Sequence, residues 1–141
     1  MTVASALTAI ASVVAGVSGI RSAPANPTEQ ANADPYAAIY VAGGNMTAGV
    51  IGSKYGLFTV AIDVLKVRKD LPRDLATLNP FLDSVPAALL AEVSSGGDMF
   101  SGNIVTFGGV EIEFLPDVNY AGVEMIGYRF MMVNVKFLTA L

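Results

Sequence analysis

The sequence predicts an α+β fold in which a mostly antiparallel sheet of four to five strands packs against two main helices. In two segments apolar residues recur every three or four positions, as they do on one face of a helix. Other segments alternate apolar and polar residues or are rich in β-branched and aromatic residues, which is typical of strands. Short turns join the strands and the helices stand apart from them in sequence, an order that favours antiparallel pairing. The length of 141 residues fits one domain, residues 1–141.

The first helix is expected in residues 1–20, which carry no charged side chain. Thr2 is a suitable N-cap, and Gly16 or Gly19 can end the helix. The stretch lacks the basic residues of a signal peptide, and its polar residues and glycines do not suit a membrane span. The expected apolar face consists of Leu7, Ile10, Ala11, Val14 and Val17.

A connector and the first strand follow this helix. Residues 21–35 contain three prolines and no apolar period, so we expect an extended surface connector. Tyr36–Ala42 has the composition of a strand. Ala42–Gly56 is glycine-rich and aperiodic, which predicts a long, mobile loop that becomes ordered on contact with a partner.

The middle of the chain gives the clearest strand and the second helix. In Leu57–Val67, Thr59, Ala61 and Asp63 alternate with an apolar face. After a polar turn, leucines and a valine recur at helical spacing. Pro80 and Pro86 interrupt this pattern, so we expect a kink or two short helices. The apolar strand face is Phe58, Val60, Ile62 and Val64, and the helix face is Leu75, Leu78, Leu82, Val85 and Leu89.

The last third is expected to be mainly strand. Ser94–Asp98 predicts a turn, and Ile104–Phe107 and Val110–Leu115 predict strands around a glycine pair. Gly122–Leu138 alternates with two apolar faces, which predicts a central strand or one covered by a partner. One predicted face is Tyr128, Phe130 and Met132, and the other is Met131, Val133, Val135 and Phe137.

Composition excludes several classes of site. The chain has no Cys and no His, which excludes zinc fingers, thiol catalysis and Ser-His-Asp triads. Eight basic against twelve acidic residues give a net charge of −4, so no general attraction to nucleic acid is expected. Only 14% of residues are charged, against about 25% in an average domain. We interpret the deficit as surface covered by neighbouring subunits.

Three constellations are candidate sites of chemistry. Gly43-Gly44-Asn45 follows a strand but lacks the spacing of a phosphate-binding loop, so a plain loop is favoured. Glu111 and Glu113 share one strand face, where the favoured interpretation is a solvated or interface-facing side rather than acid–base or metal chemistry. Asp63 is expected either to face outward and discourage edge pairing or to meet a positive charge across an interface.

A fourth constellation is basic. Lys66, Arg68, Lys69 and Arg73 hold four of the eight basic residues within eight positions. One interpretation is a solvated turn balanced by the nearby aspartates. The other is an electrostatic contact with an acidic partner, for which these four residues are the candidate interface.

Three stretches together resemble tail terminator (tail completion) proteins of long-tailed bacteriophages. They are Val17–Gln30 leading into the strand Pro35–Val41, then Val67–Val93, then Gly122–Phe130. The most specific parts are KDLPRDLA, Lys69–Ala76, and GYRF, Gly127–Phe130. The similarity extends over nearly the whole chain.

The resemblance implies a small α+β subunit of a hexameric ring that caps the tail tube and stops its polymerisation. One face would dock on the major tail tube protein and the other on head–tail connector or neck proteins, while DNA passes through the channel. It also implies a structural virion protein at the head-proximal end of the tail, assembled in the host cytoplasm. No enzymatic activity, cofactor, metal or membrane partner is implied.

Two alternatives stay open at this point. Another head–tail connector ring, a stopper or an adaptor, has the same size and composition. A small-ligand enzyme or binding module would need a convergent polar cluster with a base, and the sequence displays none.

Overall fold

A computed structural model describes residues 3–27, 34–48, 53–104 and 106–140. Within these ranges the chain forms an α+β fold, as the sequence predicts. The elements, in order, are α1 (Val3–Ala15), β1 (Tyr36–Ala48), β2 (Ser53–Val67), α2 (Leu71–Leu78), α3 (Phe81–Ala91), the 3₁₀ helix η1 (Glu92–Gly102), β3 (Gly109–Tyr120) and β4 (Val123–Ala140).

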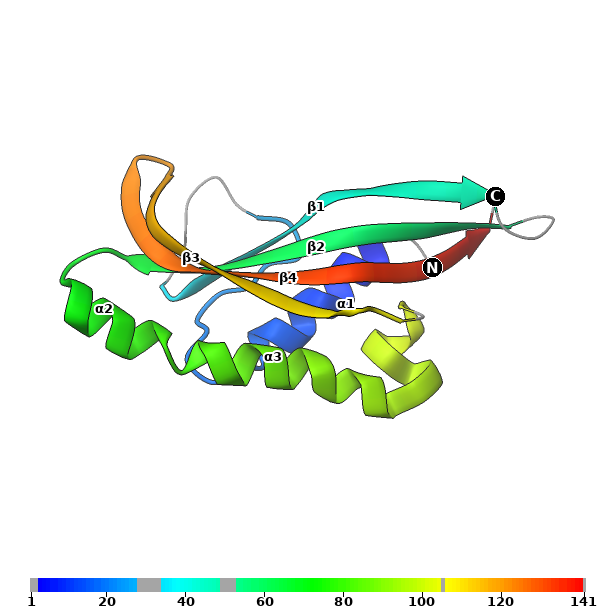
Figure 1. Cartoon of the computed structure of the whole chain (residues 1–141), viewed down its shortest axis with the longest axis horizontal. Helices are drawn as coiled ribbons and strands as arrows, with labels where there is room; N and C mark the ends of the chain where they lie inside the picture. Colours follow the sequence, from blue (N-terminus) through cyan, green and yellow to red (C-terminus); the bar gives the residue numbers. More distant parts are fainter. Residues whose placement is uncertain (1–2, 28–33, 49–52, 105, 141) are drawn as a thin grey trace.

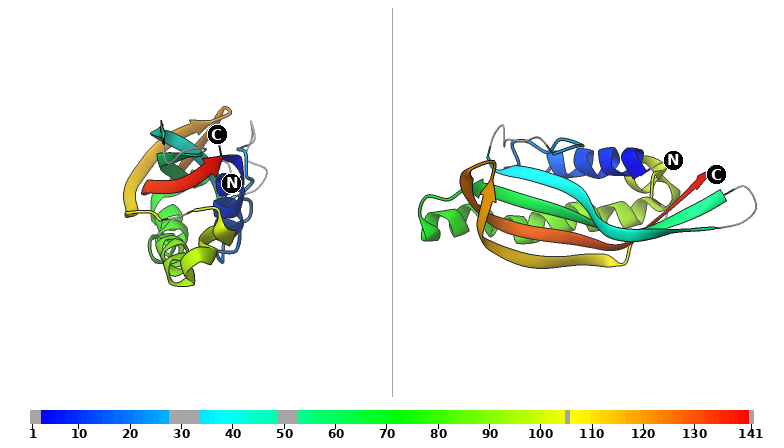
Figure 2. Two further views of the ribbon diagram at one scale, coloured as in Figure 1. Left: turned by 90° about the vertical axis from the view of Figure 1, so that its right-hand side faces the viewer. Right: turned by 90° about the horizontal axis from the view of Figure 1, so that it is seen from above.

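The four strands form one sheet in the order β1-β2-β4-β3, and every neighbouring pair is antiparallel. The helices gather on one side of this sheet (Figures 1 and 2). Residues from α1, α3 and η1 pack there against alternate residues of the strands and form the main core. β4 is a central strand, which confirms one of the two predictions from its two apolar faces.

The predicted helices form where apolar residues follow the helical period. Ala6, Ile10, Ala11 and Val14 are the buried residues of α1. The second apolar pattern divides into two helices, α2 and α3, because Pro80 cannot continue the first one. Pro86 is accommodated inside α3. The prediction of two short helices is therefore confirmed.

A smaller core lies on the opposite face of the sheet, where the tip of the β3–β4 hairpin bends over it (Figure 1). Leu65, Leu115 and Met125 are its buried members. Tyr120 of the hairpin packs against Tyr36 of β1, with ring centroids 5.6 Å apart. Farther along the sheet, this face has no helix over it among the described residues, and we call it the open face.

The long loop expected for Ala42–Gly56 is wrong at both ends, because β1 continues to Ala48 and β2 begins at Ser53. Residues 49–52 lie outside the described part. One of the glycines that suggested a loop, Gly44, instead allows two strands to approach closely. A Cβ on Gly44, whose φ is +152°, would lie 2.5 Å from the carbonyl oxygen of Leu57.

The alternation predicted for the last strand holds only as far as Val133. Asn134 has a φ of +54° and lies in a β-bulge, which inserts one extra residue into β4. The insertion shifts Val135 to the face of Met132, and both are buried in the main core. The prediction that Val135 shares a face with Met131 and Val133 is therefore wrong. The side chain of Phe137 lies outside the described part.

Two further expectations in the last third need correction. Ser94–Asp98 belongs to the long 3₁₀ segment η1 rather than to a turn. Ile104–Phe107 forms no strand; within its described residues it contributes a bridge between Thr106 and Lys136. Ile104 and Phe107 are nevertheless buried in the main core, which is why their apolar character resembled that of a strand.

Candidate functional site

The open face carries a polar row that crosses the sheet. Residues opposite each other in antiparallel strands point to the same face. Asp63 on β2 is paired in register with Arg129 on β4, which in turn is paired with Glu113 on β3. Tyr40 of β1 completes the row, so all four strands contribute one side chain.

Asp63 is the centre of this row. Arg129 donates two hydrogen bonds to its carboxylate, from Nε to Oδ1 at 2.8 Å and from Nη2 to Oδ2 at 3.2 Å. The Tyr40 hydroxyl donates to Oδ2 at 2.9 Å. Glu113 Oε2 lies 3.6 Å from Arg129 Nη1 and is more exposed. The carboxylate is thus held by donors from both neighbouring strands.

The electrostatics follow from these contacts. Burial, and then the hydrogen bond to Asp63, raise the pKa of Tyr40 to about 12, so its hydroxyl stays protonated and remains a donor. The hydrogen bond to Asp63 raises the pKa of Arg129 above its usual value. Together these hydrogen bonds join β2 to both β1 and β4 through one carboxylate.

Both expectations for Asp63 are corrected by this geometry. The residue lies on a central strand, not at an edge, and its positive partner is Arg129 of the same chain rather than a residue across an interface. Glu111 and Glu113 are both exposed on β3. Among the described residues, no three His, Cys, Asp or Glu residues lie close enough together to bind a metal ion.

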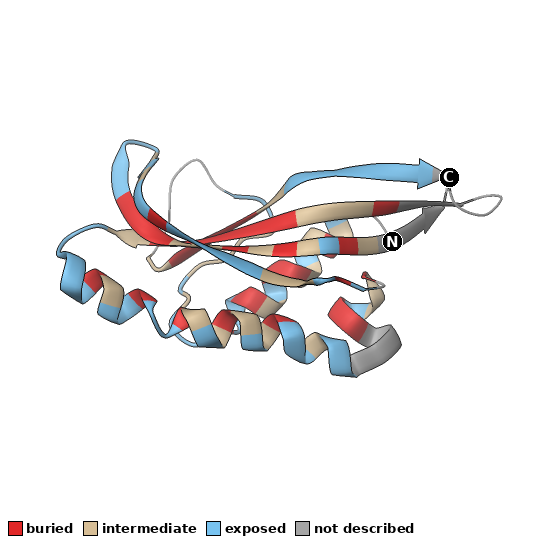
Figure 3. Ribbon diagram, viewed as in Figure 1, coloured by how far each residue is buried: buried red, intermediate tan, exposed pale blue. Residues whose placement is uncertain are grey.

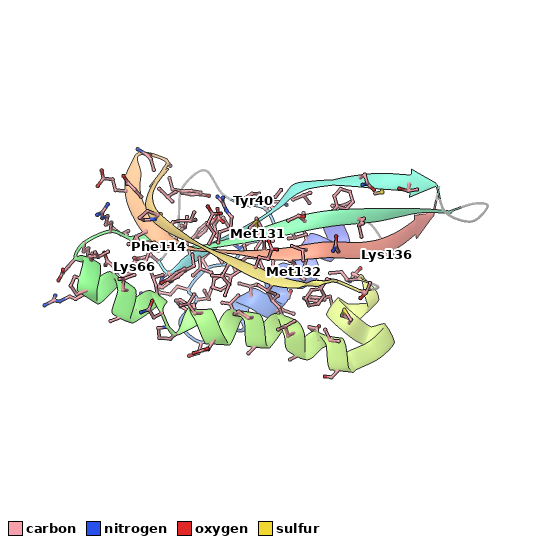
Figure 4. All side chains as sticks on the ribbon, viewed as in Figure 1. Tyr40, Lys66, Phe114, Met131, Met132 and Lys136 are labelled. Carbon is pink, nitrogen blue, oxygen red and sulfur yellow. The ribbon has the colours of Figure 1, made fainter. Side chains whose placement is uncertain are left out.

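The basic turn divides into one buried and three exposed residues. Lys66 Nζ forms an ion pair with Asp74 Oδ1 at 2.7 Å, and the two side chains are 12% and 0% exposed. Asp74 Oδ2 also accepts the backbone N–H groups of Lys69 and Asp70, at 2.9 and 3.1 Å. The hydrogen bond from Lys66 is the main cause that lowers the pKa of Asp74. Lys66 therefore fastens β2 to the start of α2 (Figure 4).

The other three basic residues lie at the surface. Arg68 is 4.0 Å from Asp117 and Arg73 is 3.7 Å from Asp70, and all four of these side chains are well exposed. Such contacts contribute little to stability. Arg68, Lys69 and Arg73 thus remain available to an acidic partner, whereas Lys66 does not.

The two most specific motifs of the resemblance have structural roles within the chain. KDLPRDLA contains the carboxylate of Asp74 and the N–H groups that it accepts. In GYRF, Gly127 is buried, and a Cβ there would overlap the carbonyl oxygen of Val64. Tyr128 donates to Asn79 Oδ1 at 2.8 Å, and Phe130 is fully buried. Both motifs therefore stabilise this fold.

Several large apolar side chains are exposed at the surface of this chain, which has few charged residues. Phe114 packs on Tyr128 with ring centroids 5.4 Å apart, yet it remains 43% exposed. Ile112 on the same strand and Met46 at the far end of β1 are exposed to a similar degree. The others are Leu71, Leu90, Val93 and Val123. These residues do not surround a cluster of polar side chains, as the residues of a ligand pocket would. We therefore treat them as candidate residues for contact with another protein.

Gly43-Gly44-Asn45 lies inside β1 and opens no helix, so it lacks the geometry of a phosphate-binding loop. None of the described helices has the length and apolar character needed to cross a bilayer. In comparisons with known proteins, neither a family model nor a curated protein matches this sequence.

Proposed function

We propose that this chain is a structural subunit of a bacteriophage tail, a tail terminator that forms a ring on the end of the tail tube. The observation that carries the proposal is the resemblance of Val17–Gln30, Val67–Val93 and Gly122–Phe130 to that family, in the same order and spacing. The ring stops tube polymerisation and provides a docking surface for the neck, and DNA passes through its channel.

Features of the described residues support an assembly role. The open face of the sheet has no helix over it among the described residues. On the other face Ile112 and Phe114, which are paired with Phe130 and Tyr128, expose apolar surface, as does Met46 near the end of β1, in a chain with only 14% charged residues. Surface of this kind is typical of subunits with large buried interfaces. The polar row at Asp63 joins neighbouring strands through hydrogen bonds, which supports a structural role.

Arg68, Lys69 and Arg73 are the residues that we assign to contact with an acidic surface of the tube or neck. Arg68 and Lys69 lie in the turn between β2 and α2, and Arg73 lies in the first turn of α2. The ion pairs of the two arginines within the chain are long and exposed. Desolvation against a partner would increase the contribution of the same charges several-fold.

Two measurements test the proposal. The mass of the purified chain, alone and mixed with assembled tail tubes, reports whether it forms a ring and where. Imaging of particles made without it then identifies the step: overlong or ragged tubes indicate a terminator. Normal tubes with unattached heads would instead assign it to the head-side connectors, the second candidate. A monomer both alone and on tubes would contradict a ring.

A further inference from the structure

The two edges of the sheet are protected to very different degrees. Natural edge strands usually carry charges, prolines or bulges that prevent pairing with another chain. β3, at one edge, has the exposed acids Glu111 and Glu113, then Pro116 and Asp117, and a bulge between Leu115 and Val118. These devices block the addition of a strand to this edge.

β1, at the other edge, also has a bulge, between Val41 and Gly43, but it has none of these charges or prolines. Its 13 residues include no charged residue and no proline. The connector covers only its start, where Ser22 forms a bridge with Tyr36 and accepts the N–H of Ala37. In the described part of the chain, β1 from Ala42 to Thr47 is exposed and extends beyond the helices (Figure 3). Among the described residues, no strand pairs with the outer side of this segment.

We propose that two copies of this chain associate in solution by antiparallel pairing of β1 with β1 of the second copy. A second copy fits as the occupant for two reasons. β1 is the less protected of the two edges, so a symmetric pair joins the two less protected edges. In such a pair the same strand lies opposite itself, so a charged residue on β1 would lie close to the same charge on the second copy. β1 carries no charged residue, so this repulsion does not arise.

The expected association is weak, because one strand pair buries less surface than a standard interface of about 1,200–2,000 Å². Interfaces of standard size range from micromolar to picomolar affinity, so we expect a dissociation constant in the micromolar range or higher. The inference concerns the free chain and does not rest on the proposed function. Sedimentation velocity across this concentration range gives the dissociation constant.

Two exposed apolar residues offer a matched pair of variants. Met46 on β1 is 43% exposed and Ile112 on β3 is 46% exposed. Met46→Lys should raise the dissociation constant about tenfold or more, because two lysines would face each other across the pair. Ile112→Lys should change it by less than about twofold. Circular dichroism and the melting temperature confirm that both variants fold, as expected for exposed positions.

Mixing distinguishes symmetric pairing from other contacts. A mixture of Met46→Lys and Met46→Glu should restore dimers, because opposite charges then meet across the strand pair. Equal weakening by Met46→Lys and Ile112→Lys would overturn the proposal in favour of head-to-tail pairing of β1 with β3. A monomer at every concentration would also overturn it.

Cross-linking gives a second measurement that does not depend on the lysine variants. The natural chain has no cysteine, so any disulfide must join introduced thiols. Under mild oxidation Met46→Cys, which this pairing places opposite its own copy, should form a disulfide-linked dimer, whereas Ile112→Cys on the opposite edge should not. Equal dimer yields from the two variants, or preferential joining of one to the other in a mixture, would contradict β1–β1 pairing.

Discussion

Asp63 and Asp74 are the two buried charged residues among those described, and the comparison between them shows how differently a carboxylate can serve one fold. Asp74 lies on the helix side and takes its donors from its own neighbourhood, Lys66 and the N–H groups of Lys69 and Asp70. Asp63 lies on the open face and takes its donors from two other strands. One fixes a connection, and the other fixes the register of the sheet.

The difference in solvent access decides the energetics. The side chain of Asp74 is 0% exposed and that of Asp63 is 11% exposed, and Arg129 beside Asp63 is 31% exposed. When Arg129 is replaced, water can reach the carboxylate of Asp63. When Asp74 is replaced, water cannot reach the donors that it accepted. Removal of a partner from a buried, hydrogen-bonded charge costs more than the same change near solvent.

The largest effect is expected for Asp74→Ala. The substitution leaves the Lys66 ammonium and two backbone N–H groups without their acceptor, which should lower the free energy of unfolding by about 3–5 kcal/mol. Urea denaturation measures the loss, and Asp83→Ala, an exposed change in the first turn of α3, is the matched control with an expected change within about 0.5 kcal/mol. Equal effects of the two variants would show that the ion pair is not structural.

The same carboxylate predicts an acid dependence of stability. Its pKa is lowered in the folded chain, so its contribution is fully present above its unfolded pKa of about 3.9. The contribution is lost as the pH falls from there through the lower folded pKa. Unfolding free energies measured from pH 6 to pH 2 should decline less steeply in Asp74→Asn than in the natural chain. Parallel curves would contradict this assignment.

An intermediate effect is expected for Arg129→Met. The variant removes two charge-assisted hydrogen bonds from Asp63, and the loss should be about 1.5–3 kcal/mol, smaller than for Asp74→Ala. A double-mutant cycle with Asp63→Asn isolates the pairwise interaction. A cost greater than that of Asp74→Ala would reverse the proposed order of the two carboxylates.

A smaller effect is expected for Tyr40→Phe, which removes one hydrogen bond and should cost about 0.5–1.5 kcal/mol. The folded pKa of Tyr40 is raised to about 12 from 10, so its contribution is present below pH 10 and is lost as the pH rises towards 12. Tyr120, raised to about 12 mainly by burial, is the comparison residue. Each Phe variant should flatten the alkaline decline in part, and no change in either would contradict the raised pKa values.

The smallest effect on stability is expected for the double change Arg68→Glu and Lys69→Glu, about 0–1 kcal/mol, because exposed ion pairs contribute little. Under the proposed function, binding to tail tubes or to the neck should weaken, and more so at low salt, where charges are screened least. Co-sedimentation with tubes at two ionic strengths measures this. A folded variant that binds normally would show that these charges are merely solvated.

Much of this fold could be predicted from the sequence because apolar period and proline position act locally. Val14 and Val85 belong to patterns that only a helix satisfies, and Pro80 divides the second pattern where the structure divides it. The glycines at 43 and 44 could not be interpreted in the same way. A glycine permits a loop and a close strand approach equally, and only the partner strand decides between them.

The polar row was missed because its interactions join distant parts of the sequence. Asp63 and Arg129 are 66 positions apart, and strand pairing alone brings them together. The sequence did show that Asp63 and Arg129 each alternate with apolar residues along a strand, so that each points away from an apolar face. By contrast, Lys66 and Asp74 are only eight positions apart, and the sequence places both near one turn. It does not indicate that Lys66, alone among the four basic residues there, is largely enclosed.

Two bulges lie next to each other across the sheet, and this placement has a dynamic consequence. The first interrupts the pairing of β1 and β2 between Val41 and Gly43, and the second that of β2 and β4 between Phe58 and Val60. Val60 is paired with both Val41 and Met132, so the interruptions form one transverse line. Three strands thus weaken at the same level, and amide hydrogen exchange should divide each of them crosswise. Within one strand, amide protons on the part that the helices cover should exchange slowly. Those on the part that extends past this line should exchange fast.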